Sequence, residues 1–170
     1  MKQLWAPWRM QYIEKASSVT GCIFCEKPGQ KCDEENLILY RGLLAFVILN
    51  AFPYSNGHLL VAPYEHTADL NDLQPAALLE MMDLTRRSIN LLTRTFHPDG
   101  FNVGINMGRA AGAGIADHIH LHIVPRWNGD TNFMPVLADA RVLPESLQQT
   151  YRRLLPIAGI AYEGDERSNG

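Results

Sequence analysis

A length of 170 residues, with 46% hydrophobic and 19% charged residues, is typical of a globular protein and excludes the disordered and collagen-like classes. The formal net charge of -3 comes without a long run of Lys and Arg, so we expect no nucleic-acid partner. No apolar stretch is long enough to cross a bilayer and the start MKQLWAPWRM lacks an apolar signal core, so we expect a cytoplasmic protein without a membrane partner.

The N-terminal segment, residues 1–21, carries the aromatic residues Trp5, Trp8 and Tyr12 in a polar setting. We interpret it as a docking arm. It belongs to a single domain that spans residues 1–162, because a chain of this length leaves little room for a second domain. Residues 163–170 are expected to form a disordered tail.

A C-x-x-C pattern follows at Cys22 and Cys25. The total of three cysteines is odd, which suits neither a secreted disulfide scaffold nor a stapled mini-protein. The spacing is that of half a zinc site, and two more ligands must come from elsewhere in the chain. A redox pair and plain packing residues are the alternatives.

Five segments combine apolar residues with flanking turn residues, and we expect them to form short β-strands. They are residues 37–41, 44–50, 58–63, 101–106 and 118–124. The first three are close enough in the chain to form a meander.

A long helix is predicted over residues 73–96, where apolar residues recur at helical spacing. The members of that stripe are Leu78, Met82, Thr85, Ile89 and Leu92. A second helix is expected over residues 144–155. The fold class is therefore α+β, an antiparallel sheet of about five strands with one long helix packed on it.

Three histidines, His118, His120 and His122, alternate with aliphatic residues along the last expected strand. Because alternate residues of a strand point to opposite faces, the three imidazoles should share one face while the aliphatic residues enter the core. A solvated, His-rich face or a metal patch without catalysis is the alternative. Three of the six histidines at strict period two favour a functional site, because imidazole is costly to place without partners.

This H-x-H-x-H pattern with apolar x resembles the signature of the histidine triad superfamily. The likeness extends to residues 46–58 with the Leu-Leu-Val-Ala-Pro that follows, and to residues 100–108, so that it covers roughly residues 22 to 127. The resemblance implies the fold of that superfamily. It also implies a homodimer in which the long helix and an edge strand form the contact.

Within the superfamily the central histidine is the nucleophile, which implies His120 here. A neutral imidazole nitrogen can attack the α-phosphorus of a nucleotide and form a phosphoramidate, which divides one slow displacement into two easier ones. The resemblance further implies that His122 contacts phosphate oxygens and that His118 lies behind the nucleophile. It adds His58 as a fourth histidine that orients the nucleophile through a hydrogen bond.

The glycine-rich stretch of residues 108–114 can bring backbone N–H groups close to phosphate oxygens, because glycine tolerates the positive φ values of anion-binding nests. We expect Gly112 and Gly114 to form this cradle, with an amide contact from Asn106. A plain flexible connection is the alternative.

The nucleoside half of the site is less well defined by the residues. By resemblance, Asn50 lies where the superfamily places a polar side chain on the ribose hydroxyls, and a turn residue is the alternative. Leu44 and Phe46 are candidates for contacts with the base.

Many hydrolase members carry Gln-Ser or Gln-Thr four residues before the first triad histidine, where this chain has Gly114-Ile115. The stretch Ala-Gly-Ala-Gly-Ile-Ala-Asp-His, like the N-terminal Leu-Trp-Ala-Pro-Trp-Arg, instead resembles the bacterial diadenosine tetraphosphate phosphorylase branch. That branch implies inorganic phosphate as the acceptor and release of ADP and ATP. Candidate acceptor-site residues are Arg109, Arg126 and Asn132.

Other functions share parts of this pattern. With water as the acceptor, the protein would be a hydrolase of dinucleoside polyphosphates, and an AMP phosphoramidase shares the covalent step. A zinc-stabilised nucleotide-binding module without turnover is the alternative from another class.

Zinc-containing members of the superfamily resemble this chain in pairing C-x-x-C with two histidines. One follows the V-x-P strand and the other is the first triad histidine, which are His66 and His118 here. The resemblance thus implies a closed, structural zinc site made by Cys22, Cys25, His66 and His118. We expect no organic cofactor.

Overall fold

The structure is a computed structural model that describes residues 21–130 and 144–163. The predicted arm up to residue 20, the predicted tail from residue 164 and the acceptor candidate Asn132 lie outside the described residues. In the described part, no helix has the length and apolar character needed to span a membrane.

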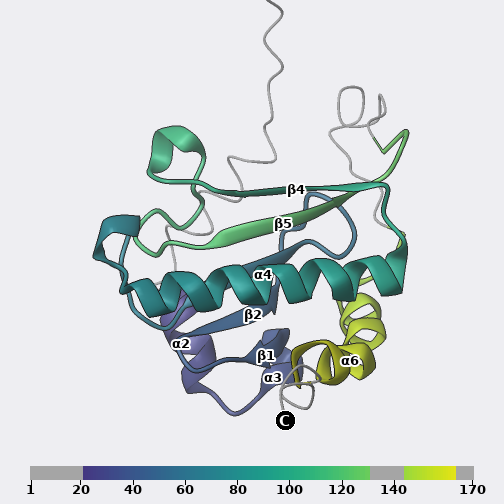
Figure 1. The fold of residues 1–170 in the computed structure, drawn as a ribbon, viewed down its shortest axis with the longest axis horizontal. Coiled ribbons are helices and arrows are strands. Elements are labelled where there is room, and N and C mark those ends of the chain that lie inside the picture. Colours follow the sequence, from purple (N-terminus) through teal and green to yellow (C-terminus); the bar gives the residue numbers. More distant parts are fainter. Residues whose placement is uncertain (1–20, 131–143, 164–170) are drawn as a thin grey trace, which may run out of the picture.

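Five strands form one antiparallel sheet in the order β1-β2-β3-β5-β4. Their bounds are β1 Ile38–Arg41, β2 Ala45–Leu49, β3 Leu59–Pro63, β4 Gly100–Ile105 and β5 Leu121–Arg126. The long helix α4, Pro75–Phe96, crosses one face of this sheet (Figure 1). The predicted α+β architecture is therefore confirmed.

Helix α4 begins at Pro75, whose fixed φ suits a first helical turn, and ends at His97 in the left-handed conformation with φ 50°. Its buried residues are Ala77, Met81, Leu84, Thr85, Ser88, Leu91 and Leu92. The predicted stripe was therefore wrong at Met82, which is 56% exposed, because the buried face is centred nearly one residue earlier in the chain.

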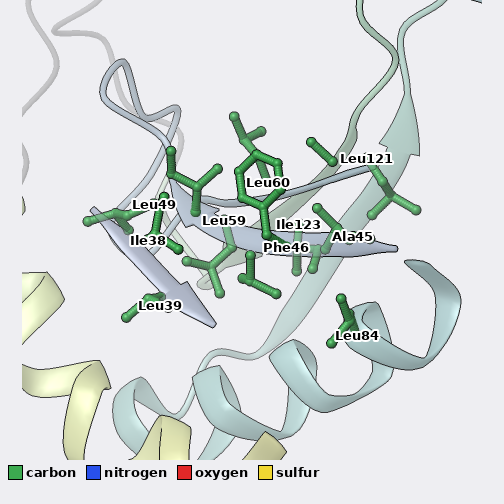
Figure 2. Packing of buried hydrophobic residues seen from close by; sticks show 14 of the residues in the cluster. Ile38, Leu39, Ala45, Phe46, Leu49, Leu59, Leu60, Leu84, Leu121 and Ile123 are labelled. Carbon is green, nitrogen blue, oxygen red and sulfur yellow. The ribbon is translucent and has the colours of Figure 1, made fainter. Parts of the chain in front are cut away.

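The core lies between the sheet and α4. Strands β2 and β3 are buried at all five positions, as expected for central strands covered on both faces. Figure 2 shows Leu84 of α4 turned toward the side chains of the sheet. Phe46, a candidate for contacts with the base, is fully buried beside Phe24 and Tyr64.

The last strand, β5, begins at Leu121 and not at His118, so the predicted strand over residues 118–124 starts too early. The ladder with β3 ends at the pair Val61 and Leu121. Beyond it Pro63 has no N–H to offer, and its carbonyl accepts a hydrogen bond from the His118 ring at 2.9 Å. The first two triad histidines therefore lie in an irregular segment just before β5, with a bend at His118.

The described chain has three more α-helices, α2 Ile23–Gly29, α3 Asp33–Asn36 and α6 Leu147–Glu163, and two 3₁₀ helices, Leu70–Asp72 and Arg109–Ala111. Helix α6 continues past Pro156, well beyond the predicted end at residue 155. It lies beside α4 and β1, where the Tyr162 hydroxyl is 2.6 Å from the Ser88 hydroxyl and the Tyr151 hydroxyl donates to the Ile38 carbonyl at 2.9 Å.

Candidate functional site

Three imidazoles meet where β3 and β5 run side by side. His58 directly precedes β3, His122 lies in β5 opposite Leu60, and His120 directly precedes β5. The ring centroids of His120 and His122 are 4.8 Å apart, and those of His58 and His122 are 5.2 Å apart. We call these three residues the histidine cluster.

The proton positions on two of these rings follow from their partners. The Tyr54 backbone N–H donates to His58 Nδ1 at 3.1 Å, so His58 carries its proton on Nε2 when neutral. That Nε2–H faces His122 Nδ1 at 3.0 Å and donates to it. His122 must then carry its own proton on Nε2, which is buried and has no hydrogen-bond partner among the described residues.

The third ring has the opposite tautomer. His120 Nδ1 lies 2.8 Å from the carbonyl oxygen of His118, which can only accept, so the ring proton is on Nδ1. The lone pair of His120 Nε2 is left available. The cluster thus presents a basic nitrogen on His120 and an unsatisfied N–H on the adjacent His122.

Burial keeps these rings neutral. Desolvation lowers the pKa of His120, and its hydrogen bond to the His118 carbonyl opposes this shift. Desolvation, with a smaller contribution from His120, lowers the pKa of His122 to about 4. Both rings are therefore neutral at pH 7, each with one N–H, as a nucleophile and a neutral hydrogen-bond donor require.

His58 was expected to orient the nucleophile, but its Nε2 bond goes to His122, and the orienting bond on His120 comes from the His118 carbonyl. The physical reason is the early end of the β3–β5 ladder, which leaves the backbone carbonyl of His118 free to turn toward the ring two residues later. A backbone group of this kind leaves no signal in the residue pattern.

The ring nitrogens of His118 contact groups outside the histidine cluster: Nε2 contacts the Pro63 carbonyl, and Nδ1 contacts the two cysteines and His66. The metal-binding atoms of Cys22, Cys25, His66 and His118 all lie within 4.8 Å of one another. His118 Nδ1 is 3.2 Å from Cys22 Sγ and 3.2 Å from His66 Nδ1, and Cys25 Sγ is 3.3 Å from His66 Nδ1. We call these four residues the Cys/His cluster.

The four donors fit a tetrahedral cation. Zinc–sulfur and zinc–nitrogen bonds of about 2.3 and 2.0 Å place tetrahedral ligands roughly 3.3 to 3.8 Å apart. Because His118 Nε2 donates to the Pro63 carbonyl, its Nδ1 lone pair points at the other three donors. A thiol S–H can donate to the ring nitrogens at these distances, and the same four atoms would bind a cation once the thiols lose their protons.

The glycine-rich loop contains the short 3₁₀ turn Arg109–Ala111. Gly108 and Gly112 have the positive φ values expected for it, 76° and 87°, but Gly114 does not. The chain completes its turn at Gly112, whose N–H donates to the Arg109 carbonyl at 3.0 Å. No second residue in the left-handed conformation is therefore needed after it. Asn106, directly after β4, is half-buried.

Two predicted contact residues are engaged within the protein. The Asn50 side-chain oxygen accepts from the Phe52 N–H at 2.9 Å, and its amide nitrogen is 3.2 Å from His58 Nδ1, so both ends of the side chain have a partner within this loop. Arg126 forms a two-pronged contact with Asp130 and donates to Asn102. Arg109 is exposed on its loop.

Two residues near the site were missed. The ring of Phe24, inside the C-x-x-C motif, lies 5.2 Å from that of His118 and 4.8 Å from that of His120. The ring of Tyr54 is nearly parallel to that of His122 and 4.8 Å from that of His58. Only the apolar position of Phe24 between two candidate ligands could have indicated its role.

An antiparallel sheet backed by one long helix, with paired imidazoles of opposite tautomer at its centre, defines the class of histidine triad proteins. The family model of the HIT domain matches residues 32–129. This chain belongs to the HIT domain family.

Named relatives span most of the chain. An AP-4-A phosphorylase of Mycobacterium tuberculosis (strain ATCC 25618 / H37Rv) is 40% identical over 163 residues, which cover 91% of this chain and 83% of the relative. An adenosine 5'-monophosphoramidase of Schizosaccharomyces pombe is 34% identical over 108 residues, 64% of this chain and 76% of the relative. A zinc-bound histidine triad family protein of Mycobacterium smegmatis has a similar solved structure, with a TM-score of 0.66, 32% identity, and coverage of 89% of this chain and 98% of that one.

Proposed function

We propose that the protein is a nucleotidyl-transfer enzyme that acts on dinucleoside polyphosphates, with diadenosine tetraphosphate phosphorylase as its activity. The observation that carries this proposal is the pair of opposite tautomers on His120 and His122. The 40% identity to the AP-4-A phosphorylase over 91% of this chain supports the choice of substrate.

In the first step, His120 Nε2 attacks the α-phosphorus of the substrate. The N–P bond forms as the P–O bond to the leaving group breaks, and the electron pair leaves with that oxygen as ATP. The unsatisfied Nε2–H of His122 is suited to bind a phosphate oxygen on which charge develops in the transition state. His58 keeps that proton in place through its own bond to His122.

In the second step, an oxygen of inorganic phosphate attacks the phosphorus of the adenylyl-His120 adduct. The N–P bond breaks, its electron pair returns to Nε2, and ADP leaves. Gly112, Gly114 and Asn106 are proposed to contact the phosphates, and Asn50 the ribose. The lone pair of the neutral ring is what makes it both a nucleophile and a leaving group.

The covalent step is tested by incubating the protein with diadenosine tetraphosphate and measuring its mass. We expect an AMP adduct on the wild type and none on His120→Ala. The acceptor is tested by comparing products with and without inorganic phosphate. We expect ADP and ATP when phosphate is present. Release of AMP at an unchanged rate without phosphate would mean that the protein is a hydrolase and not a phosphorylase.

We propose that the Cys/His cluster binds structural zinc. Support comes from its convergent donor atoms and from the zinc-bound relative of similar structure. With four protein ligands the site is closed, so the ion would stabilise the fold and take no part in the chemistry. Metal analysis of the purified protein should give about one zinc per chain by this ligand count.

We further propose a cytoplasmic homodimer. Strand β4 is the outer edge of the sheet, where Val103 is 45% exposed, and α4 exposes Leu79 and Met82. An open edge and an apolar helix face suit pairing with a second copy. Free thiols at Cys22, Cys25 and Cys32 suit a reducing compartment. A sedimentation experiment that gave a monomer at micromolar concentration would contradict the dimer.

A further inference from the structure

The loop that leads into β3, residues 50–58, contains His58 and the backbone N–H that fixes its tautomer. We call it the catalytic loop. It is held from three directions. The Ser55 hydroxyl donates to the Pro125 carbonyl at 2.6 Å, Gly57 lies against α4, and Asn56 contacts α6. The third contact is unusual because α6 lies outside the range matched by the HIT domain.

The contact with α6 is a partly buried hydrogen bond from a buried hydroxyl. Thr150 is 1% exposed, and its hydroxyl donates to the Asn56 side-chain oxygen at 2.9 Å, with the Glu145 carboxylate farther away at 3.3 Å. A threonine hydroxyl has one proton, so the shorter contact to Asn56 takes it.

The start of α6 is built to present this hydroxyl. The Gln149 side chain accepts from the Ser146 N–H at 3.1 Å, while the Ser146 hydroxyl accepts from the Gln149 N–H at 3.2 Å. This reciprocal pair is a capping box, which fixes the first turn of a helix. Thr150 is therefore held at a defined place next to the catalytic loop.

The consequence for the histidine cluster follows along the loop. Asn56 is two residues from both Tyr54 and His58, and the Tyr54 N–H donates to His58 Nδ1 at 3.1 Å. If Asn56 loses its anchor, that N–H moves relative to the ring. The Asn50 amide, 3.2 Å from His58 Nδ1, then remains as a donor to that nitrogen, so the preference of His58 for a proton on Nε2 weakens, and with it the preference of His122.

We propose that Thr150 is a positioning residue of this enzyme, which fixes the tautomers of His58 and His122 through its hydrogen bond to Asn56. The part of this inference that concerns rate rests on the proposed function. The part that concerns tautomers does not, because it can be measured on the protein without substrate.

The test compares Thr150→Val, which keeps the shape and removes the hydroxyl, with Thr150→Ser, which restores it. Ser88→Ala is the matched control, because it removes a buried hydroxyl contact between α4 and α6 at Tyr162, which lies farther along α6 from Thr150. The tautomers are read from the ¹⁵N signals of the imidazoles in the free, full-length protein. The rate of AMP adduct formation is read from single-turnover mass measurements.

We expect Thr150→Val to give mixed tautomers at His58 and a slower adduct step, on the order of tenfold, with little change in substrate binding. Thr150→Ser should restore both, and Ser88→Ala should change neither. Wild-type tautomers in Thr150→Val would overturn the inference. If Thr150→Val does not fold, Asn56→Ala tests the same hydrogen bond, because it removes the half-exposed acceptor. It must give the same tautomer mixture at His58.

The two proposals can fail separately. Absence of an adduct on the wild type would contradict the proposed function while the tautomer measurement remained decisive for Thr150. A normal adduct step together with unchanged tautomers in both Thr150→Val and Asn56→Ala would contradict only the role of Thr150.

Discussion

His118 and His120 are two residues apart, yet the structure uses them in opposite ways. Both ring nitrogens of His118 have partners, one in the Cys/His cluster and one at the Pro63 carbonyl. Among the residues that the structure describes, His120 has a partner on Nδ1 alone. Burial is similar, at 0% and 4% exposure, so it does not separate the two roles. The number of satisfied nitrogens does, because a nitrogen without a partner is the one that can react.

The strongest test of this contrast is the change His120→Ala. It should lower the turnover of diadenosine tetraphosphate by about 10⁴-fold or more, since the nucleophile itself is removed. Metal content should not change, because His120 is not in the Cys/His cluster. Turnover and bound zinc are measured on the same preparation. Substantial remaining turnover would mean that another residue forms the adduct.

The next largest effect is expected for His122→Ala, which removes the unsatisfied Nε2–H. The adduct should still form, but about 10²- to 10³-fold more slowly, as for the loss of one transition-state donor. Single-turnover rates of the adduct step measure this. A loss as complete as that of His120→Ala would show that the two rings act as one unit.

On the other side of the contrast, His66→Ala tests the Cys/His cluster with little disturbance of packing, since His66 is exposed. Zinc affinity should fall by more than about a hundredfold, because losing a ligand exceeds the loss of an outer-shell partner. His97→Ala is the matched control, an exposed histidine outside the cluster. Zinc titration against a competing chelator measures both. Equal affinities would exclude His66 as a ligand.

Acid should sharpen the contrast further. The pKa of His122 is about 4 in the folded protein and about 6.5 when unfolded, so the unfolded chain binds more protons between these values. The contribution of the neutral His122 ring to the free energy of unfolding is therefore fully present above about pH 6.5. It is lost as the pH falls toward 4, and the loss is at most about 3 kcal/mol.

This pH effect is measured by denaturant unfolding of the wild type and His122→Asn at pH 7 and at pH 4.5. The comparison between the two proteins matters because protons also compete for the metal ligands. The loss of stability on acidification should be smaller in His122→Asn. Equal losses of stability in the two proteins would contradict the lowered pKa of His122.

The smallest effect is expected at the backbone that carries His58. Gly57 has φ 75°, and an added Cβ would lie 3.0 Å from Leu92 and 3.1 Å from Phe96. Gly57→Ala should destabilise the fold by about 1 to 3 kcal/mol. Gly129→Ala is the control, with φ 80° and no atom near the added Cβ. Unfolding free energies measure both, and equal losses would exclude the packing contribution.

The sheet, the long helix and the association of Cys22, Cys25, His66 and His118 could be predicted from residue patterns and from a family likeness. Alternation placed His120 beside His122 correctly. It did not reveal that strand β5 begins only after His120. The start of β5 depends on Pro63, whose carbonyl accepts a hydrogen bond from the ring of His118, 55 residues away in the chain.

Contacts between distant segments account for the other failures. The expected partner of His58 was His120, but His120 bonds to the backbone carbonyl of His118. Such a partner cannot be singled out from the sequence, because every residue has a backbone carbonyl. The end of α6 was placed at a proline that the helix passes, since Tyr162 is anchored beyond it by Ser88. The nucleotide-contacting residues stay predictions.

Cys22 and His118 are separated by 96 positions in the chain. An ion held between them would act as a cross-link that closes a loop of more than half the molecule. Such a link restricts the unfolded chain in the way that a disulfide does, and its effect grows with the length of the loop. Unlike a disulfide it survives a reducing environment, so the availability of metal would set how long the folded molecule persists.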